Sequence, residues 1–291
     1  MIRPDGFAKA RRRLVIRQLE DQNDGRDERQ LFQLESQPGG VPMHAEVNDS
    51  NITLPDDPLW NPAKLPNFRV SYFRAPQLKM LISEIFLNGA YLFHTDKKQP
   101  LILDCGSNIG ISILFFKMLY PGARIIGFEP DPDTFEILRT NVRQNSLHDV
   151  ELQQCALYDR EGAIDLHRGL FKGALRMSLL EERLPGRKIS VSSRRLSSFI
   201  TEDIDLLKLD IEGAEQFVLQ ELADSAKLSR IDQIHIEYHH HIIGKTDTLS
   251  STLKLLEDGG FGYQISAHPR HGSWPKREEF QDISIYCYRK R

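Results

Sequence analysis

The sequence has few cysteines, and their spacing fits no known scaffold. Its 291 residues include only Cys105, Cys155 and Cys287, which lie far apart. This excludes a disulfide framework and gives no zinc-ligand spacing. No run approaches the roughly 18 apolar residues that a membrane span needs, and no apolar signal core follows the basic N-terminus. We therefore expect a cytoplasmic protein with no membrane span.

The chain also lacks an excess of positive charge. It has 38 Lys and Arg against 41 Asp and Glu, a formal net charge of −3. Nucleic-acid-binding proteins usually carry a basic surface. We therefore expect no nucleic-acid partner. The basic cluster Arg11–Arg13 is more simply a solvated helix face or an oligomer contact. A helical arm of this kind is compatible with a homodimer.

A complete dinucleotide-binding fingerprint is also missing. The apolar run 101–103 predicts a buried strand, and a glycine loop and an apolar helix from Ile111 follow it. The loop reads Asp-x-Gly-x-Asn-x-Gly instead of Gly-x-Gly-x-x-Gly, with Asn108 at the second glycine position. Asp104 at the strand end would repel a pyrophosphate but suits a ligand that carries an ammonium group. The loop therefore favours S-adenosylmethionine over NAD.

Strands and helices alternate after this loop. The predicted strands cover 124–128, 150–155, 204–209 and 231–237, and two closing strands cover 261–265 and 283–287. This order predicts an α/β fold with a doubly wound, mostly parallel sheet, which binds ligands at the carboxyl ends of its strands. The acids at or just beyond these ends are Asp104, Glu129, Asp159, Asp210 and Glu237. Glu129 lies 19 residues after Gly110, a distance suited to holding ribose hydroxyls.

The first third of the chain has a different composition. Residues 1–97 are rich in proline and polar residues, and we predict a mostly helical or irregular extension there. Within it, the apolar spacing from Leu78 to Phe86 predicts a helix at the entrance or edge of the catalytic domain. Residues 98–291 form the predicted domain. An inserted hairpin within 159–191 is expected to lie over the sheet, where Arg168 could contact an anionic substrate.

Four segments resemble the FkbM family of S-adenosylmethionine-dependent methyltransferases: DCGSNIG, FEPDP, LLKLDIEGAE and IEYHH. The resemblance covers about 101–240. It implies a class I methyltransferase fold, seven strands with the last antiparallel, and methyl transfer to a hydroxyl of a natural product or sugar. The cofactor residues expected on this basis are Asp104, Gly106, Ser107, Asn108 and Gly110 at the methionine end, Glu129 at the ribose, and Ala156 and Leu157 beside the adenine.

An alcohol is a poor nucleophile at neutral pH, so its proton must be removed. His239 and His235 are candidate bases near the end of the fifth strand, and Asp210 is a third candidate catalytic residue. Asp210 and Glu237 could instead converge on Mg²⁺, which would lower the pKa of the hydroxyl. The structural alternatives are a satisfied core histidine for His235 and a helix-capping role for Asp210.

Two other functions stay open from the sequence. An NAD-dependent oxidoreductase is favoured by Glu129 at its strand end and opposed by the missing glycines. A non-catalytic partner module with the same fold is opposed by the presence of Asp104, Glu129 and Asp210.

Overall fold

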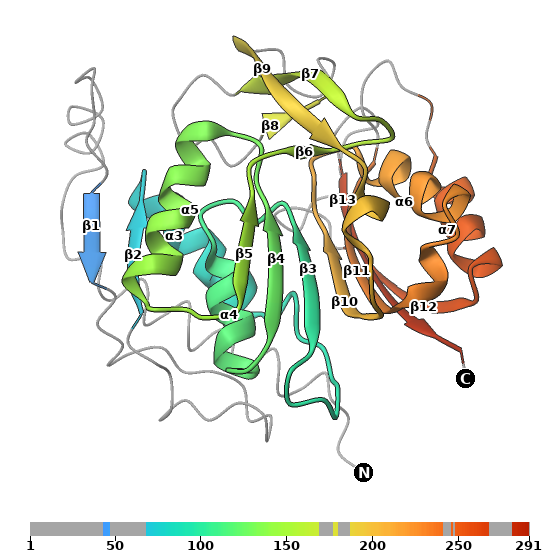
Figure 1. Cartoon of the computed structure of the whole chain (residues 1–291), viewed down its shortest axis with the longest axis horizontal. Coiled ribbons are helices and arrows are strands. Elements are labelled where there is room, and N and C mark those ends of the chain that lie inside the picture. The colour runs from blue at the N-terminus through green and yellow to red at the C-terminus, as the bar shows by residue number, and fades with distance from the viewer. Residues whose placement is uncertain are drawn as a thin grey trace.

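The computed structural model describes residues 43–46, 68–168, 177–179, 187–240, 246, 248–267 and 281–290. Their backbone forms a seven-stranded central sheet flanked by helices, a four-stranded sheet and a two-stranded pair (Figure 1). None of the helices in these ranges is both long and apolar enough to cross a membrane. The predictions for the Arg11–Arg13 cluster and for residues 169–176 and 180–186 of the insert lie outside the described residues.

The central sheet has the strand order β12-β13-β11-β10-β3-β4-β5. Its strands are β3 (Leu101–Cys105), β4 (Arg124–Phe128), β5 (Val150–Gln153), β10 (Ile204–Leu209), β11 (Ile231–His240), β12 (Phe261–Ser266) and β13 (Gln281–Arg289). All run parallel except β13, which is antiparallel to both of its neighbours. The predicted doubly wound sheet with a reversed last strand is confirmed. The strand order reverses between β3 and β10, where such sheets bind ligands.

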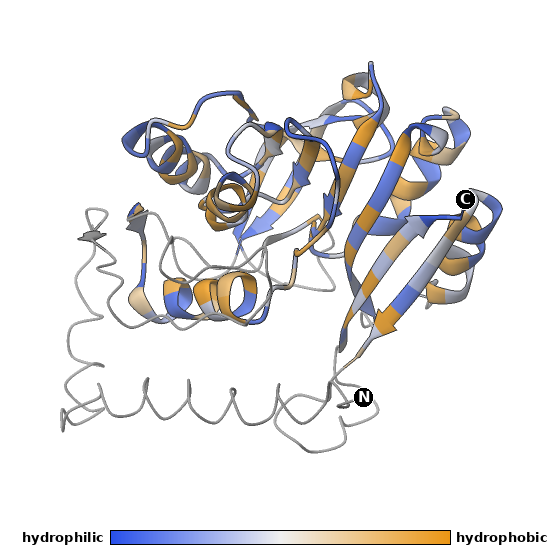
Figure 2. Ribbon diagram, turned by 90° about the horizontal axis from the view of Figure 1, so that it is seen from below, coloured by the Kyte–Doolittle hydropathy of each residue, from blue (hydrophilic) through white to orange (hydrophobic). Residues whose placement is uncertain are grey.

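Helices cover both faces of the sheet, because the strands are apolar on both sides. One face carries α3 (Ala75–Ile82), its π-helical continuation η3 (Ser83–Leu87), α4 (Ile111–Leu119) and α5 (Pro132–Gln144); the other carries α6 (Glu215–Asp224) and α7 (Leu249–Asp258). Alternate residues of β3 belong to different cores: Ile102 packs with the α4 side, and Leu103 with the α6 side. Figure 2 shows hydrophobic residues along the strands and the flanking helices.

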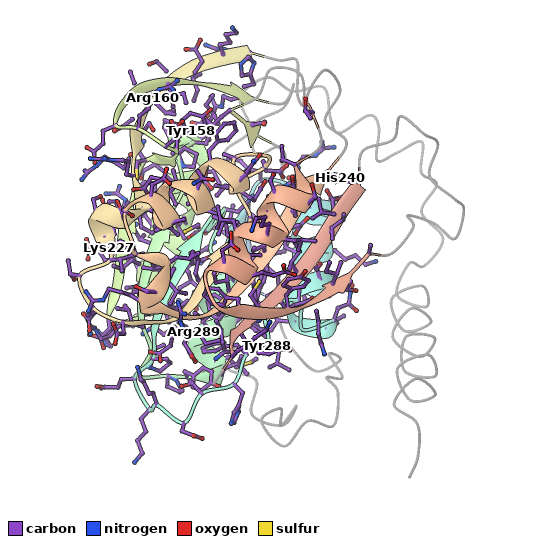
Figure 3. The ribbon with its side chains drawn as sticks, turned by 90° about the vertical axis from the view of Figure 1, so that its right-hand side faces the viewer. Tyr158, Arg160, Lys227, His240, Tyr288 and Arg289 are labelled. Carbon is purple, nitrogen blue, oxygen red and sulfur yellow. The ribbon has the colours of Figure 1, made fainter. Side chains whose placement is uncertain are left out.

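A second, smaller sheet stands at the carboxyl ends of the parallel strands (Figure 1). It consists of β6 (Ala156–Leu157), β7 (Gly162–Arg168), β8 (Met177–Ser178) and β9 (Arg187–Arg194) in the order β6-β9-β7-β8. Tyr158 and Arg160 mark this end of the molecule, and Arg289 marks the opposite end (Figure 3). The described part of the insert thus lies over the sheet, as predicted.

The described part of the first third packs onto the same domain. The strand β1 (Met43–Glu46) pairs with β2 (Arg69–Tyr72), and β2 lies against α5. The buried side chain of Asn141 accepts a hydrogen bond from the Ser71 N–H (2.6 Å) and donates to the carbonyls of Ser71 (3.0 Å) and Ile109 (2.7 Å). The Phe86 ring of η3 meets the Phe115 ring of α4 edge-on. Residues 68–93 therefore contribute to a hydrophobic core shared with the sheet.

The strand β11 is longer than predicted. It runs past Glu237 to His240, because β13 pairs with it along this length, His239 opposite Asp282. No local pattern indicates this extension, since consecutive histidines do not favour a strand. At the other end, Arg289 packs over the Phe261 ring and donates to the carbonyls of Ile231, Gly259 and Leu228. These contacts anchor the last strand of the sheet.

Replacing Asn141 with Ala is expected to lower the free energy of unfolding by about 3 kcal/mol, because it leaves buried backbone groups of Ser71 and Ile109 without their hydrogen bonds. Urea denaturation measures this change. Arg139→Ala, an exposed change on the same helix, is the control and should alter stability by about 0.5 kcal/mol or less. Equal stability of the two variants would contradict this account of how β2 is held.

Candidate active site

A cavity of about 410 Å³ lies at the carboxyl ends of β3, β4, β10 and β11. This volume is in the range of small-ligand sites. Its walls come from the β3–α4 loop, the end of β4, the start of the small sheet, the ends of β10 and β11, and the α3–η3 cap. One cavity thus connects six of the predicted cofactor residues (Gly106, Ser107, Asn108, Glu129, Ala156 and Leu157) with the predicted catalytic residues Asp210 and His239.

The β3–α4 loop fits closely against the end of β10. Gly106 has φ +85°, and a Cβ added there would lie 1.8 Å from the carbonyl oxygen of Asp210. Asn108 has φ 49°, a left-handed conformation that Asn tolerates better than most residues. Both residues line the cavity. The loop therefore needs glycine at 106 because the two strand ends touch.

Asp104 does not line the cavity, which differs from its predicted role beside a ligand ammonium. Its buried carboxylate meets the ammonium of Lys208 (3.2 Å) and accepts a hydrogen bond from the Ser112 hydroxyl (2.6 Å). Lys208 faces Asp104 across the parallel pairing of β3 and β10. Burial lowers the pKa of Lys208, but the carboxylates of Asp104 and Asp210 outweigh it and raise the pKa. Asp104 therefore balances the positive charge of Lys208 and not that of a ligand ammonium.

Glu129 is positioned at the end of β4, as predicted. Its carboxylate accepts hydrogen bonds from the backbone N–H groups of Asn108 (3.1 Å) and Asp131 (2.9 Å) and lines the cavity. Burial raises its pKa to about 8, although the two amides oppose the shift. Ala156 and Leu157 line the same cavity from the small sheet. The structure thus brings the ribose and adenine candidates together.

The part of the cavity at the ends of β10 and β11, called the acceptor end below, contains three candidate catalytic and metal-binding residues. Asp210, Glu237 and His239 offer ligand atoms that all lie within 4.8 Å of one another. The predicted convergence of Asp210 and Glu237 is thereby confirmed. Burial and the Asp210 carboxylate raise the pKa of Glu237 well above its usual range. The hydroxyl of Tyr91 donates to Asp210 (3.0 Å) and fixes this carboxylate from the cap side.

His239 is held by a buried carboxylate. Its Nδ1 lies 2.7 Å from the Glu215 Oε1, and its side chain is 1% exposed. Glu215 also accepts hydrogen bonds from the backbone N–H groups of Ile211 and Gly213. Burial raises the pKa of Glu215, but His239 and these amides outweigh it, so the pKa falls below its usual value. An ionised Glu215 fixes the ring and directs Nε2 toward the cavity.

Other predicted residues lie apart from this end of the cavity. His235 is buried in the sheet against the Tyr286 ring, does not line the cavity, and has its pKa lowered to about 4 by burial. The structure therefore favours His239 over His235 as a candidate base. Ser107 lines the cavity, and its hydroxyl donates to the Asp104 carbonyl (2.8 Å). Gly110 serves as the N-cap of α4 with φ 91°.

Two further expectations are corrected. Asp159, counted among the strand-end acids, does not line the cavity and pairs with Arg160 (3.5 Å). Arg168, considered as a substrate contact, forms ion pairs with Asp131 (2.5 Å) and Asp133 (2.7 Å) at the start of α5. It joins the small sheet to the cofactor end of the domain.

Sequence reasoning missed several residues of the site. Glu84 and Tyr91 line the cavity from the cap, and Asp282 reaches it from the start of β13. Glu84 lies in η3, whose wider π-helical turns are frequent at functional sites. The helical spacing predicts this helix but not the side chains that it turns toward the cavity. Asp282 can be assigned to the site only from the β11–β13 register, which places it opposite His239.

Comparison with known proteins agrees with this geometry. The profile of the Methyltransferase FkbM domain matches residues 104–263, and the chain belongs to this family. Methyltransferase sdnD of Sordaria araneosa is 30% identical over 232 residues, covering 66% of this chain and 86% of sdnD. The 31-O-demethyl-FK506 methyltransferase FkbM of Streptomyces tacrolimicus is 29% identical over 233 residues (68% and 87%). The 2-O-methyltransferase NoeI of Sinorhizobium fredii (strain NBRC 101917 / NGR234) is 33% identical over 162 residues (49% and 65%).

Among solved structures, the methyltransferase FkbM from Methylobacillus flagellatus KT aligns with a TM-score of 0.47 and 19% identity, over 71% of this chain and 47% of that chain. The family and the strand order identify the chain as a class I methyltransferase, and this implies S-adenosylmethionine as methyl donor. The result favours the methyltransferase prediction over the NAD-dependent oxidoreductase.

The raised pKa of Glu129 predicts a pH effect on stability. Because its pKa is about 8 in the folded protein against an ordinary 4.5, the folded state keeps a proton that the unfolded state releases between these values. This stabilising contribution is complete below pH 4.5 and is lost as the pH rises through 8. Glu129→Gln cannot ionise, so wild-type stability should fall more steeply with pH than that of the variant, by up to about 1.4 kcal/mol per pH unit.

Urea unfolding of both proteins at several pH values between 5 and 8 measures the two slopes. Glu136→Gln, on the exposed face of α5, is the control and should keep the wild-type slope. Identical slopes for wild type and Glu129→Gln would contradict the raised pKa.

Proposed function

We propose that the protein transfers a methyl group from S-adenosylmethionine to a hydroxyl oxygen of a small molecule, natural product or glycan. The observation that carries this proposal is the single cavity that connects the β3–α4 loop and Glu129 with the cluster of Asp210, Glu237 and His239. Two family relatives support the oxygen acceptor, since their names describe a 31-O-demethyl and a 2-O substrate position.

The cofactor end of the cavity has suitable chemistry for S-adenosylmethionine. The Glu129 carboxylate can accept hydrogen bonds from two ribose hydroxyls. Ala156, Leu157 and Leu166 supply apolar surface for an adenine ring. Gly106, Ser107 and Asn108 of the β3–α4 loop line the part of the cavity where the methionine end would lie. When bound, the cofactor supplies an electrophilic methyl group on a sulfonium.

The protein must orient the acceptor and take its proton. The cap residues Met80, Leu81 and Ile85 provide apolar contacts for the acceptor, and Asp210, Glu237 and His239 line the same cavity. Alignment of the two reactants supplies much of the rate enhancement in such displacements. The proton of the alcohol can be removed in one of two ways. His239 can act as a general base oriented by Glu215, or the oxygens of Asp210 and Glu237 can hold a divalent cation that acidifies the hydroxyl.

Mg²⁺ is the cation predicted from the sequence, and the two carboxylates fit its preference for oxygen ligands. The identity of the acceptor within these classes, the homodimer and the cytoplasmic location stay predictions.

Calorimetric titration with S-adenosylmethionine tests the cofactor site. Wild type should bind saturably, and Glu129→Ala should raise the Kd roughly 10–100-fold because the hydrogen bonds to the ribose hydroxyls are lost. Glu202→Ala is the matched control, since Glu202 pairs with Arg124 at the opposite end of β4. Folded wild-type protein that binds no S-adenosylmethionine would overturn the proposal and favour a non-catalytic module.

A second experiment tests the acceptor atom. The protein is incubated with isotopically methyl-labelled S-adenosylmethionine and a panel of hydroxyl-bearing natural products and glycans. We expect label in an ether linkage, which resists alkaline hydrolysis, and a loss of roughly 100-fold or more in His239→Asn. Transfer confined to amine or carboxylate acceptors would contradict O-methylation.

A further inference from the structure

We propose that Asp210, Glu237 and His239 together bind a divalent transition-metal cation, with Mn²⁺ preferred over Mg²⁺, and that Glu215 positions His239 for this purpose. The sequence pointed only to the two carboxylates and to Mg²⁺. The structure adds a histidine nitrogen as the third ligand, and this changes the class of ion that the site should select. The role of the ion in catalysis rests on the proposed function, but its binding does not.

The first argument is the orientation of His239. Its Nδ1 is engaged by Glu215 at 2.7 Å, and its Nε2 lies 3.9 Å from the Glu237 Oε1. Metal-binding histidines usually donate their second ring N–H to a carboxylate or carbonyl, which fixes the tautomer and raises the basicity of the ligating nitrogen. The buried Glu215 carboxylate occupies this position. The other ring nitrogen of His239, Nε2, lies on the side of Glu237 at the cavity wall.

The second argument is distance. Nitrogen and oxygen ligands lie about 2.0–2.2 Å from ions of this size, so two ligands on one ion can be separated by up to roughly 4.3 Å. The His239–Glu237 separation is within this limit, and the full set spans at most 4.8 Å. Small side-chain rotations therefore suffice to bring all three onto one ion. Asp210 and Glu237 are half-buried at the cavity wall, so an ion and a substrate hydroxyl can both reach them.

The third argument is charge. Two more carboxylates approach the His239 Nε2, Glu212 at 3.5 Å and Asp282 at 3.8 Å. Among the described residues that line the cavity, Lys208 is the only lysine or arginine, and its ammonium contacts Asp104 (3.2 Å) and Asp210 (3.7 Å). A divalent cation placed among the described carboxylates around His239 would be attracted by each of them.

The mixed ligand set decides the kind of ion. Mg²⁺ prefers an all-oxygen octahedral shell and keeps several waters. Imidazole favours transition metals, whereas carboxylates suit Mn²⁺ as well as Mg²⁺, so two carboxylates with one imidazole favour Mn²⁺. An acceptor hydroxyl bound to such an ion would ionise more easily, so His239 acts as a ligand and not as the general base.

Titration with Mn²⁺, followed by the loss of the free-ion electron paramagnetic resonance signal, tests the site without cofactor or acceptor. Wild type should bind about one equivalent, and tenfold excess Mg²⁺ should not displace it. Glu237→Gln, Asp210→Asn and His239→Asn should each weaken binding at least tenfold, and Glu215→Gln roughly 10–100-fold. Glu202→Gln, which removes an exposed carboxylate paired with Arg124 at the opposite end of β4, is the control and should bind Mn²⁺ within about twofold of wild type.

Calorimetric binding of S-adenosylmethionine by each variant shows that its fold is intact. If His239→Asn does not fold, the half-buried Glu237 and Asp210 variants decide the result. Absent Mn²⁺ binding, or binding unchanged in these variants, would overturn the metal site while leaving the methyltransferase proposal intact, provided that the cofactor still binds. Equal displacement by Mg²⁺ would overturn the preference for a transition metal.

Discussion

The Lys208 ammonium is the interaction on which the two halves of the site depend. It is 2% exposed and contacts the carbonyls of Gly106 and Cys105 at 2.8 and 3.2 Å, the Asp104 carboxylate at 3.2 Å and the Asp210 carboxylate at 3.7 Å. A buried charge is tolerated only when it is paired and hydrogen-bonded, so these groups must keep their places. The same ammonium therefore sets the cofactor loop and the acceptor-side carboxylate at a fixed separation.

In the two halves of the site, a buried glutamate has a pKa shifted in different directions. At the cofactor half, Glu129 is desolvated but satisfied by two amides, which leaves a carboxylate whose pKa is about 8. At the acceptor half, Glu215 is equally buried but ionised, since His239 and backbone amides compensate it. The pKa values of two similarly buried glutamates thus shift in opposite directions, because their neighbours differ.

Much of this was predictable from the sequence. Apolar runs, glycines and strand-end acids predicted the sheet, the cofactor loop and the convergence of Asp210 with Glu237, because those features follow from local periodicity and from the rule that parallel strands bind ligands at their carboxyl ends. The partner of Asp104 was not predictable. Lys208 lies on a neighbouring strand far along the chain, and only strand pairing reveals it. The contact of His239 with Asp282 likewise depends on a register that no local pattern encodes.

The cap has a consequence for how such enzymes diversify. The family profile matches residues 104–263, and Met80, Leu81, Glu84 and Tyr91 line the cavity from earlier in the chain. This wall therefore comes from elements other than the β3–α4 loop and β4, which supply Gly106 and Glu129. Substitutions in α3 and η3 can change the shape and charge of the cavity while those cofactor-side residues stay as they are.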